Sequence, residues 1–129
     1  MELLFDYTNI RKLRRIIYNV PADTTVIKAS VAFTSHEILV DKAINNNISL
    51  FWWGLFNEDE PTAIKILKKV MNNKDIITFY PIQNNFHSKV IFFENYGIYI
   101  GSANITQKAL NDNIEAGVFM DIEKLYDYE

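Results

Sequence analysis

The hydrophobic pattern of the chain switches between two spacings, and these predict helices and strands in turn. Apolar positions three and four residues apart predict helices at about 8–18, 35–45 and 60–71, with Ser35 as the N-cap of the second. Runs rich in Val, Ile and aromatic residues predict strands at about 26–33, 48–53, 76–80, 87–93, 98–100 and 114–120, with a short helix near 107–110. This order predicts an α/β fold in which helices flank a mixed β-sheet.

Trp52 and Trp53 are adjacent in one predicted strand, so their side chains alternate between its two faces. We expect one ring to pack in the core and the other to contact a helix or a partner subunit. Base stacking, or contact with a substrate, is the alternative for the outward ring.

The first predicted helix carries four cations opposite its apolar stripe: Arg11, Lys12, Arg14 and Arg15. A solvated helix face is the favoured interpretation, and a patch that faces phosphate is the alternative.

Length and composition fit one domain over residues 1–129, because 129 residues with 49% hydrophobic content can bury a core. This domain is either a complete chain or a piece of a longer one. The formal net charge is −3, which argues against a dedicated nonspecific nucleic-acid binder but is compatible with a local basic patch. No cysteine is present, which excludes disulfides and is compatible with a cytoplasmic location. The two histidines cannot form a His-rich metal site, and neither a signal peptide nor a membrane-spanning run is evident.

The stretch 86–106 concentrates the chemistry of the chain. An apolar strand begins with His87 and Lys89, two residues apart and therefore on one face. A turn at 95–97 leads into a returning strand, which ends in the small polar segment Gly101-Ser102-Ala103-Asn104. The hairpin therefore brings an imidazole, an ammonium, a hydroxyl and a carboxamide together. The alternative is structural: strand ends meet solvent, and Ser102 or Asn104 caps a helix.

This set of groups suits a phosphodiester substrate. Lys89 supplies a cation for the phosphate, and Ser102 and Asn104 supply neutral hydrogen-bond donors. His87 is then a candidate nucleophile, if an acceptor holds its second nitrogen, and Glu115 is the candidate acceptor. Glu94 falls on the strand face opposite His87, which favours a structural ion-pairing role for Glu94. The alternative is that the turn at Asn95 directs the Glu94 side chain toward the site.

The motif resembles the signature of the phospholipase D superfamily. His87-Ser-Lys89 is followed after four residues by an acid, Glu94, then by Gly101-Ser102-x-Asn104 and later by Glu115. The acid is Asp in the family pattern, so Glu94 keeps the charge and adds one methylene.

The resemblance implies a phospholipase D-like α/β sandwich and a metal-independent phosphodiesterase with no cofactor. One motif's histidine forms a phosphohistidine and a second protonates the leaving oxygen. His87 would be the nucleophile or the acid, Lys89 and Asn104 would bind phosphate, and Ser102, Glu115 and Glu94 would support them. His36 is followed by Glu37-Ile38, so the chain has one motif, and a complete site requires a homodimer.

Short single-motif members of the superfamily resemble bacterial nucleases and restriction endonucleases, which implies an endonuclease acting on DNA. Two other functions stay open. One is a phosphodiesterase that hydrolyses phospholipids, for which only Phe51-Trp52-Trp53 hints at a membrane-docking surface. The other is a noncatalytic module for dimerisation or nucleic-acid binding, which Glu94 in place of Asp and the acidic net charge would suit.

Overall fold

The computed structural model describes residues 2–33, 37–55, 61–82, 89–101 and 115–121. Its elements are β1 (Glu2–Asp6), α1 (Tyr7–Tyr18), β2 (Val26–Phe33), α2 (Ile38–Asn46), β3 (Ser49–Leu55), α3 (Pro61–Asn72), β4 (Ile77–Pro81), β5 (Lys89–Phe93), β6 (Gly97–Gly101) and β7 (Glu115–Asp121).

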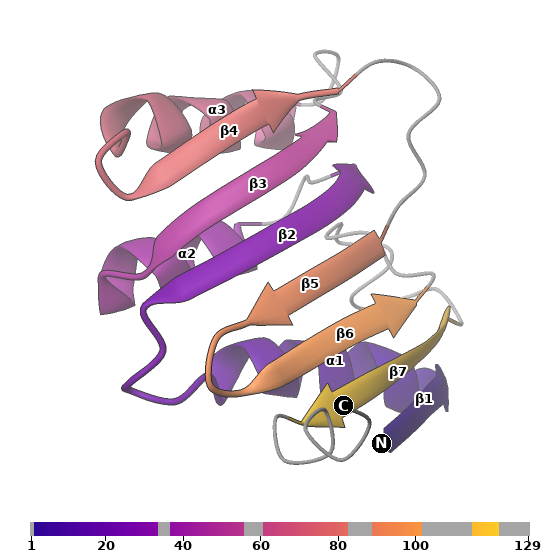
Figure 1. Cartoon of the computed structure of the whole chain (residues 1–129). Helices are drawn as coiled ribbons and strands as arrows, with labels where there is room; N and C mark the ends of the chain where they lie inside the picture. Colours follow the sequence, from indigo (N-terminus) through magenta and orange to yellow (C-terminus); the bar gives the residue numbers. More distant parts are fainter. Residues whose placement is uncertain (1, 34–36, 56–60, 83–88, 102–114, 122–129) are drawn as a thin grey trace.

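The strands form one seven-stranded mixed sheet in the order β1-β7-β6-β5-β2-β3-β4. The neighbours β2, β3 and β4 are parallel, whereas β5 pairs antiparallel with β2, and β6, β7 and β1 continue the antiparallel pairing. The three described helices lie behind the sheet, on one of its faces (Figure 1). The predicted α/β fold with a mixed sheet is therefore confirmed.

The core lies between this face and the helices, and strand alternation decides which side chains reach it. In β2, Ile27, Ala29 and Val31 are buried, whereas Lys28 between them is exposed. From the helices, Leu13, Ile16, Ile17, Leu39, Val40, Ala43, Ile66 and Val70 are buried against the sheet. The first helix has the apolar stripe that its spacing predicts, because Leu13, Ile16 and Ile17 are all buried.

Several predicted boundaries shift in the structure. The chain also contains β1, which the sequence pattern did not reveal because its short run Leu3-Leu4-Phe5 shows no alternation. Helix α2 begins at Ile38 with Glu37 as its N-cap, so the start predicted at Ser35 is wrong; Ser35 lies outside the described residues. Strand β4 includes Pro81, one residue beyond the predicted end at residue 80. Pro81 is tolerated because β4 is an edge strand, where a missing N–H removes no ladder bond.

The two tryptophans occupy opposite faces, as predicted. Trp52 is 1% exposed, and its indole N–H donates to the Val31 carbonyl at 3.4 Å. Its ring lies 4.8 Å from that of Phe79, centroid to centroid. Trp53 is half-buried on the other face and stacks on Tyr80.

This contrast predicts unequal losses of stability. Trp52→Ala should lower the free energy of unfolding by about 3–5 kcal/mol, because it leaves a large cavity in the core. Trp53→Ala should cost about 1 kcal/mol, since it loses mainly a ring contact at a partly exposed position. Denaturant unfolding of both variants measures this difference, and equal losses would contradict the assignment of the two faces.

Candidate active site

The register of three strands brings motif-bearing strand ends to one edge of the sheet. Val31 of β2 pairs with Lys89, the first residue of β5, and Val90 pairs with Ile100 of β6. Lys89 therefore starts β5 where β6 ends at Gly101. Strand β7 continues this edge, because Gly101 pairs with Gly117 and Glu115 begins the strand two residues earlier. The backbones of β5 and β7 are two strand spacings apart here, about 10 Å.

Three predicted site residues, His87, Ser102 and Asn104, lie outside the described residues. They attach directly to this edge in the sequence. His87 precedes Lys89 by two positions, Ser102 follows Gly101, and Asn104 comes two positions later. Glu115 is described only as the first residue of β7. The structure thus brings together the ends of three strands, which include Lys89 and Glu115 and which the other three residues adjoin in the sequence alone.

Alternation along β5 places Lys89 on the same face as Ile91 and Phe93. Ile91 and Phe93 are fully buried beneath the helices, whereas Lys89, at the end of the strand, is half-buried. The strand is thus anchored by its apolar residues, and its cation lies at the rim of the sheet.

The hairpin that fixes this register has a tight turn. Asn95 adopts a left-handed conformation with φ 57°, and the Tyr96 N–H donates to the Phe93 carbonyl at 3.1 Å. The returning strand starts at Gly97, where a Cβ would lie 2.4 Å from the Met120 carbonyl oxygen. A side chain here would push β6 away from β7. The glycine therefore holds the strands that carry the motif in close contact.

Glu94, the sixth predicted residue, lies at the opposite end of β5, five residues or about 17 Å from Lys89. Its Oε1 accepts hydrogen bonds from the Thr25 hydroxyl at 2.7 Å and from the Thr25 N–H at 3.0 Å. The Glu94 carbonyl oxygen accepts from the buried Thr24 hydroxyl at 2.8 Å. The hydrogen bond from the Thr25 hydroxyl, and then the one from its N–H, lowers the pKa of Glu94.

Glu94 therefore ties the hairpin to the start of β2, and the structure does not bring it to the strand ends that carry the other residues. The structural role predicted for Glu94 was an ion pair, whereas its described partners are the hydrogen-bond donors of Thr25. Sequence reasoning missed Thr24 and Thr25. No local signal marks them, because they are about 70 residues from Glu94 in the chain and only the β2–β5 pairing brings them close.

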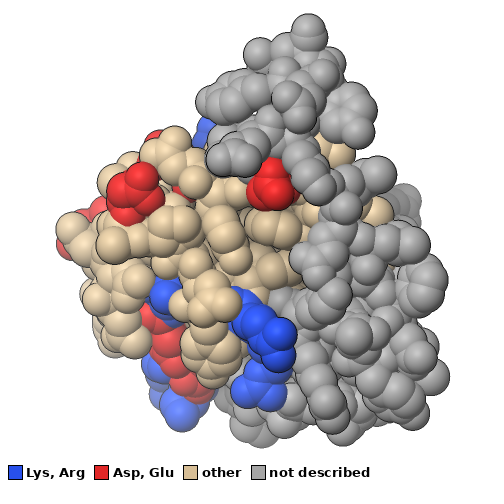
Figure 2. All heavy atoms as spheres, turned by 90° about the horizontal axis from the view of Figure 1, so that it is seen from below, with Lys and Arg blue, Asp and Glu red and all other residues tan. Residues whose placement is uncertain are grey.

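On the face that Figure 2 draws, the basic side chains of the described residues lie beside carboxylates. Lys69 of α3 binds both Glu37 and Asp41, at 2.7 Å from the latter, and Lys65 lies 3.1 Å from Glu37. The hydrogen bond from Lys69 is the main cause that lowers the pKa of Glu37, and the two carboxylates raise the pKa of Lys69. These charges join α2 to α3, so they are structural.

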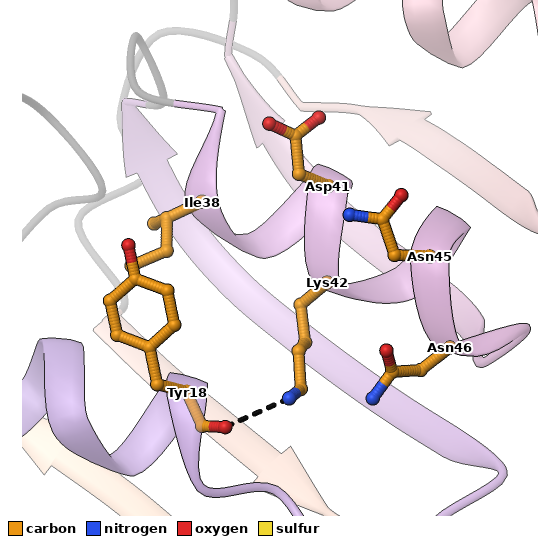
Figure 3. A pocket seen from close by; sticks show the side chains of 6 residues that line it. All are labelled: Tyr18, Ile38, Asp41, Lys42, Asn45 and Asn46. Carbon is orange, nitrogen blue, oxygen red and sulfur yellow. Dashed lines mark hydrogen bonds between the residues drawn. The ribbon is translucent and has the colours of Figure 1, made fainter.

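A pocket of about 370 Å³ lies between the end of α1 and the outer side of α2 (Figure 3). It is lined by Tyr18, Ile38, Asp41, Lys42, Asn45 and Asn46. The Lys42 ammonium donates to the Tyr18 carbonyl oxygen at 2.8 Å, so this cation joins the two helices. The pocket contains none of the predicted site residues.

The residues that the structure describes contain no group of three or more His, Cys, Asp or Glu placed to hold a metal ion. None of the helices that the structure describes is long and apolar enough to cross a bilayer.

Fold and motif together define the class of protein. The chain belongs to the family of phospholipase D-like domains: residues 22–128 match the family described as "Cardiolipin synthase, PLD-like domain". No curated protein matches the chain.

Solved structures show the same fold. The phospholipase D family member Nuc from Salmonella typhimurium is 19% identical, with a TM-score of 0.70 over 98% of this chain and 88% of that chain. NucT from Helicobacter pylori is 13% identical, with a TM-score of 0.68 over 98% of this chain and 91% of that chain. Phosphatidylserine synthase from Haemophilus influenzae is 10% identical, with a TM-score of 0.67 over 98% of this chain but only 36% of that one.

The Glu94 anchor gives a prediction that a carboxyl titration checks. Thr25→Val removes the hydroxyl donor but keeps the N–H, so the pKa of Glu94 should rise part of the way toward its ordinary value. Because the folded-state pKa is depressed, the stability lost in the variant should be largest above the ordinary pKa. It should vanish as pH falls through the folded-state value.

The measurement is the NMR titration of the Glu94 carboxyl, with unfolding measured at neutral and acidic pH. Thr78→Val, the same change at an exposed position of β4, is the matched control and should leave the Glu94 titration unchanged. An identical Glu94 titration in Thr25→Val and the wild type would show that the anchor does not exist.

Proposed function

We propose that the chain is a metal-independent phosphodiesterase, an endonuclease that acts through a phosphohistidine in a site shared by two chains. The observation that carries this proposal is the convergence of strand ends at one edge. Lys89, Gly101 and Glu115 stand at the adjacent ends of β5, β6 and β7, and His87, Ser102 and Asn104 adjoin these ends in the sequence.

The proposed chemistry follows from the charge of a phosphodiester, which repels nucleophiles. Lys89 binds a nonbridging oxygen as a cation, while Ser102 and Asn104 donate hydrogen bonds to the phosphate. The neutral imidazole of His87 attacks phosphorus, while its other nitrogen keeps its proton and donates a hydrogen bond to Glu115. A nitrogen–phosphorus bond forms as the bond to the leaving oxygen breaks.

A second imidazole completes the cycle by giving its proton to the leaving oxygen. It then takes a proton from water as that water attacks the phosphohistidine and releases His87. Residues 1–129 carry one His-x-Lys motif, so the second imidazole is the partner's His87 across a two-fold axis. The unit proposed to be catalytic is therefore a homodimer of this domain.

The single His-x-Lys motif in residues 1–129 favours the nuclease branch over lipid chemistry, because short single-motif members of the superfamily resemble nucleases. The family description, which mentions cardiolipin synthase, keeps a phospholipid substrate as the second candidate. The substitution of Glu94 for Asp gives little support to a noncatalytic module, because Glu94 binds Thr25 far from the proposed chemistry.

Point changes should reduce turnover in a fixed order. His87→Ala should abolish it, because one residue supplies both nucleophile and acid in a symmetric dimer, and Lys89→Ala should be nearly as severe. Ser102→Ala and Asn104→Ala should each lower the rate by about 10²–10³-fold, the usual effect of losing a preorganised donor. Glu94→Asp should leave the rate near that of the wild type.

Initial rates on plasmid, single-stranded DNA and a simple phosphodiester, all in EDTA, test this order, with circular dichroism as the control for folding. Strict dependence on Mg²⁺ or Mn²⁺, or a wild-type rate in His87→Ala, would refute the mechanism. Turnover of phospholipid but no nucleic acid would favour the second candidate.

A further inference from the structure

The sheet face opposite the described helices carries two side-chain rows that cross the strands. One row runs through Tyr80, Trp53, Ser30, Val90, Ile100 and Val118, each paired in register with the next. The second runs through Thr78, Phe51, Lys28, Phe92, Ile98 and Met120. The rows are aliphatic on β6 and β7, and they become aromatic and polar on β2, β3 and β4.

The aromatic part contains a ring pair with an open side. Trp53 and Tyr80 stack with centroids 4.7 Å apart and planes 12° from parallel, and Tyr80 is 39% exposed. Tyr80 lies on the edge strand, so the described sheet does not continue beyond it. The stack therefore ends in a ring to which another flat ring can add.

The charge around this pair favours an anionic ligand. The six positions on β2, β3 and β4 are Ser30, Lys28, Trp53, Phe51, Tyr80 and Thr78, which include one cation and no carboxylate. Lys28 is exposed in the second row, where it pairs in register with Phe51 and Phe92. Aromatic rings beside a cation are what single-stranded nucleic acids bind, through base stacking and phosphate contacts.

The ring pair also lies near the proposed catalytic edge. Trp53 and Tyr80 are close to the ends of β3 and β4, and the register places Trp53 level with Val90, the neighbour of Lys89. Two strand spacings, about 10 Å, separate the backbones of β3 and β5. Lys89 belongs to the helix-covered face, whereas Trp53 and Tyr80 lie on the opposite face. A nucleic-acid strand that contacts the ring pair and also Lys89 must therefore pass over the strand ends.

We propose that Trp53 and Tyr80 form a stacking platform for an unpaired base of a single-stranded nucleic acid, with Lys28 contacting its backbone. This inference rests on the proposed nuclease function and names the form of its substrate.

Two protein occupants fit this region less well. One is a second copy of the chain, but a two-fold contact centred on Lys28, Trp53 and Tyr80 would bring two Lys28 ammonium groups together. Strand addition at the β4 edge is also disfavoured, because the Ile77 N–H already donates to the Asn73 carbonyl at 2.8 Å and Pro81 has no N–H.

The test measures binding in a His87→Ala background, so that the probe stays intact. The probes are a thymidine oligonucleotide, an abasic oligonucleotide with the same number of phosphates, and a duplex. Tyr80→Ala should weaken binding of the thymidine oligonucleotide by about 10-fold, whereas Tyr80→Phe should retain it. Binding of the abasic probe and of the duplex should not change. Tyr18→Ala is the control, since Tyr18 is 59% exposed at the end of α1.

The binding measurements test the stacking platform independently of whether the chain cleaves DNA. Equal affinity of Tyr80→Ala and its parent for the thymidine oligonucleotide, or equal losses with the abasic probe, would overturn the platform even if the wild type cleaves DNA. Base-dependent binding that requires Tyr80 would support it even if no cleavage is found. A change in oligomeric state of Tyr80→Ala, with base-dependent binding intact, would assign this face to a second copy instead.

Discussion

The antiparallel pairing of β5 with β2 is the constraint on which the candidate site depends. It aligns Val31 with Lys89 at one end and holds Glu94 against Thr25 at the other. A slip by one residue would turn Ile91 and Phe93, both fully buried, toward the opposite face. The core therefore fixes the register, and the register places the start of β5 beside the end of β6 and near the start of β7.

The two faces of the sheet have different roles in this account. One is covered by α1, α2 and α3, and it contains the buried residues that make the strands rigid (Figure 1). The other carries Lys28, the stacked Trp53 and Tyr80, and aliphatic side chains such as Ile100, which is 53% exposed. The proposed chemistry lies at the rim between them.

Sequence reasoning predicted the order of most elements, because long apolar runs such as 26–33 and helical stripes such as that of Leu13, Ile16 and Ile17 reflect burial directly. It also identified the strands that carry the motif. It missed β1, whose short run shows no period, and it misplaced the start of α2. The pairing of Glu94 with Thr25 and the stacking of Trp53 on Tyr80 join residues far apart in the sequence, so only the strand register reveals them. The predicted roles of His87, Lys89, Ser102, Asn104 and Glu115 stay predictions.

The central claim is that one active site needs the motifs of two chains, and subunit mixing tests it most directly. Wild-type chain at a fixed concentration is unfolded and refolded with increasing amounts of His87→Ala chain, and nuclease activity per wild-type chain is measured. Since mixed dimers would lack one imidazole, a ninefold excess of the variant should lower this activity about tenfold. An excess of Tyr18→Ala chain should not lower it. Activity per wild-type chain that is independent of added His87→Ala would show that each chain acts alone, and would contradict the shared site.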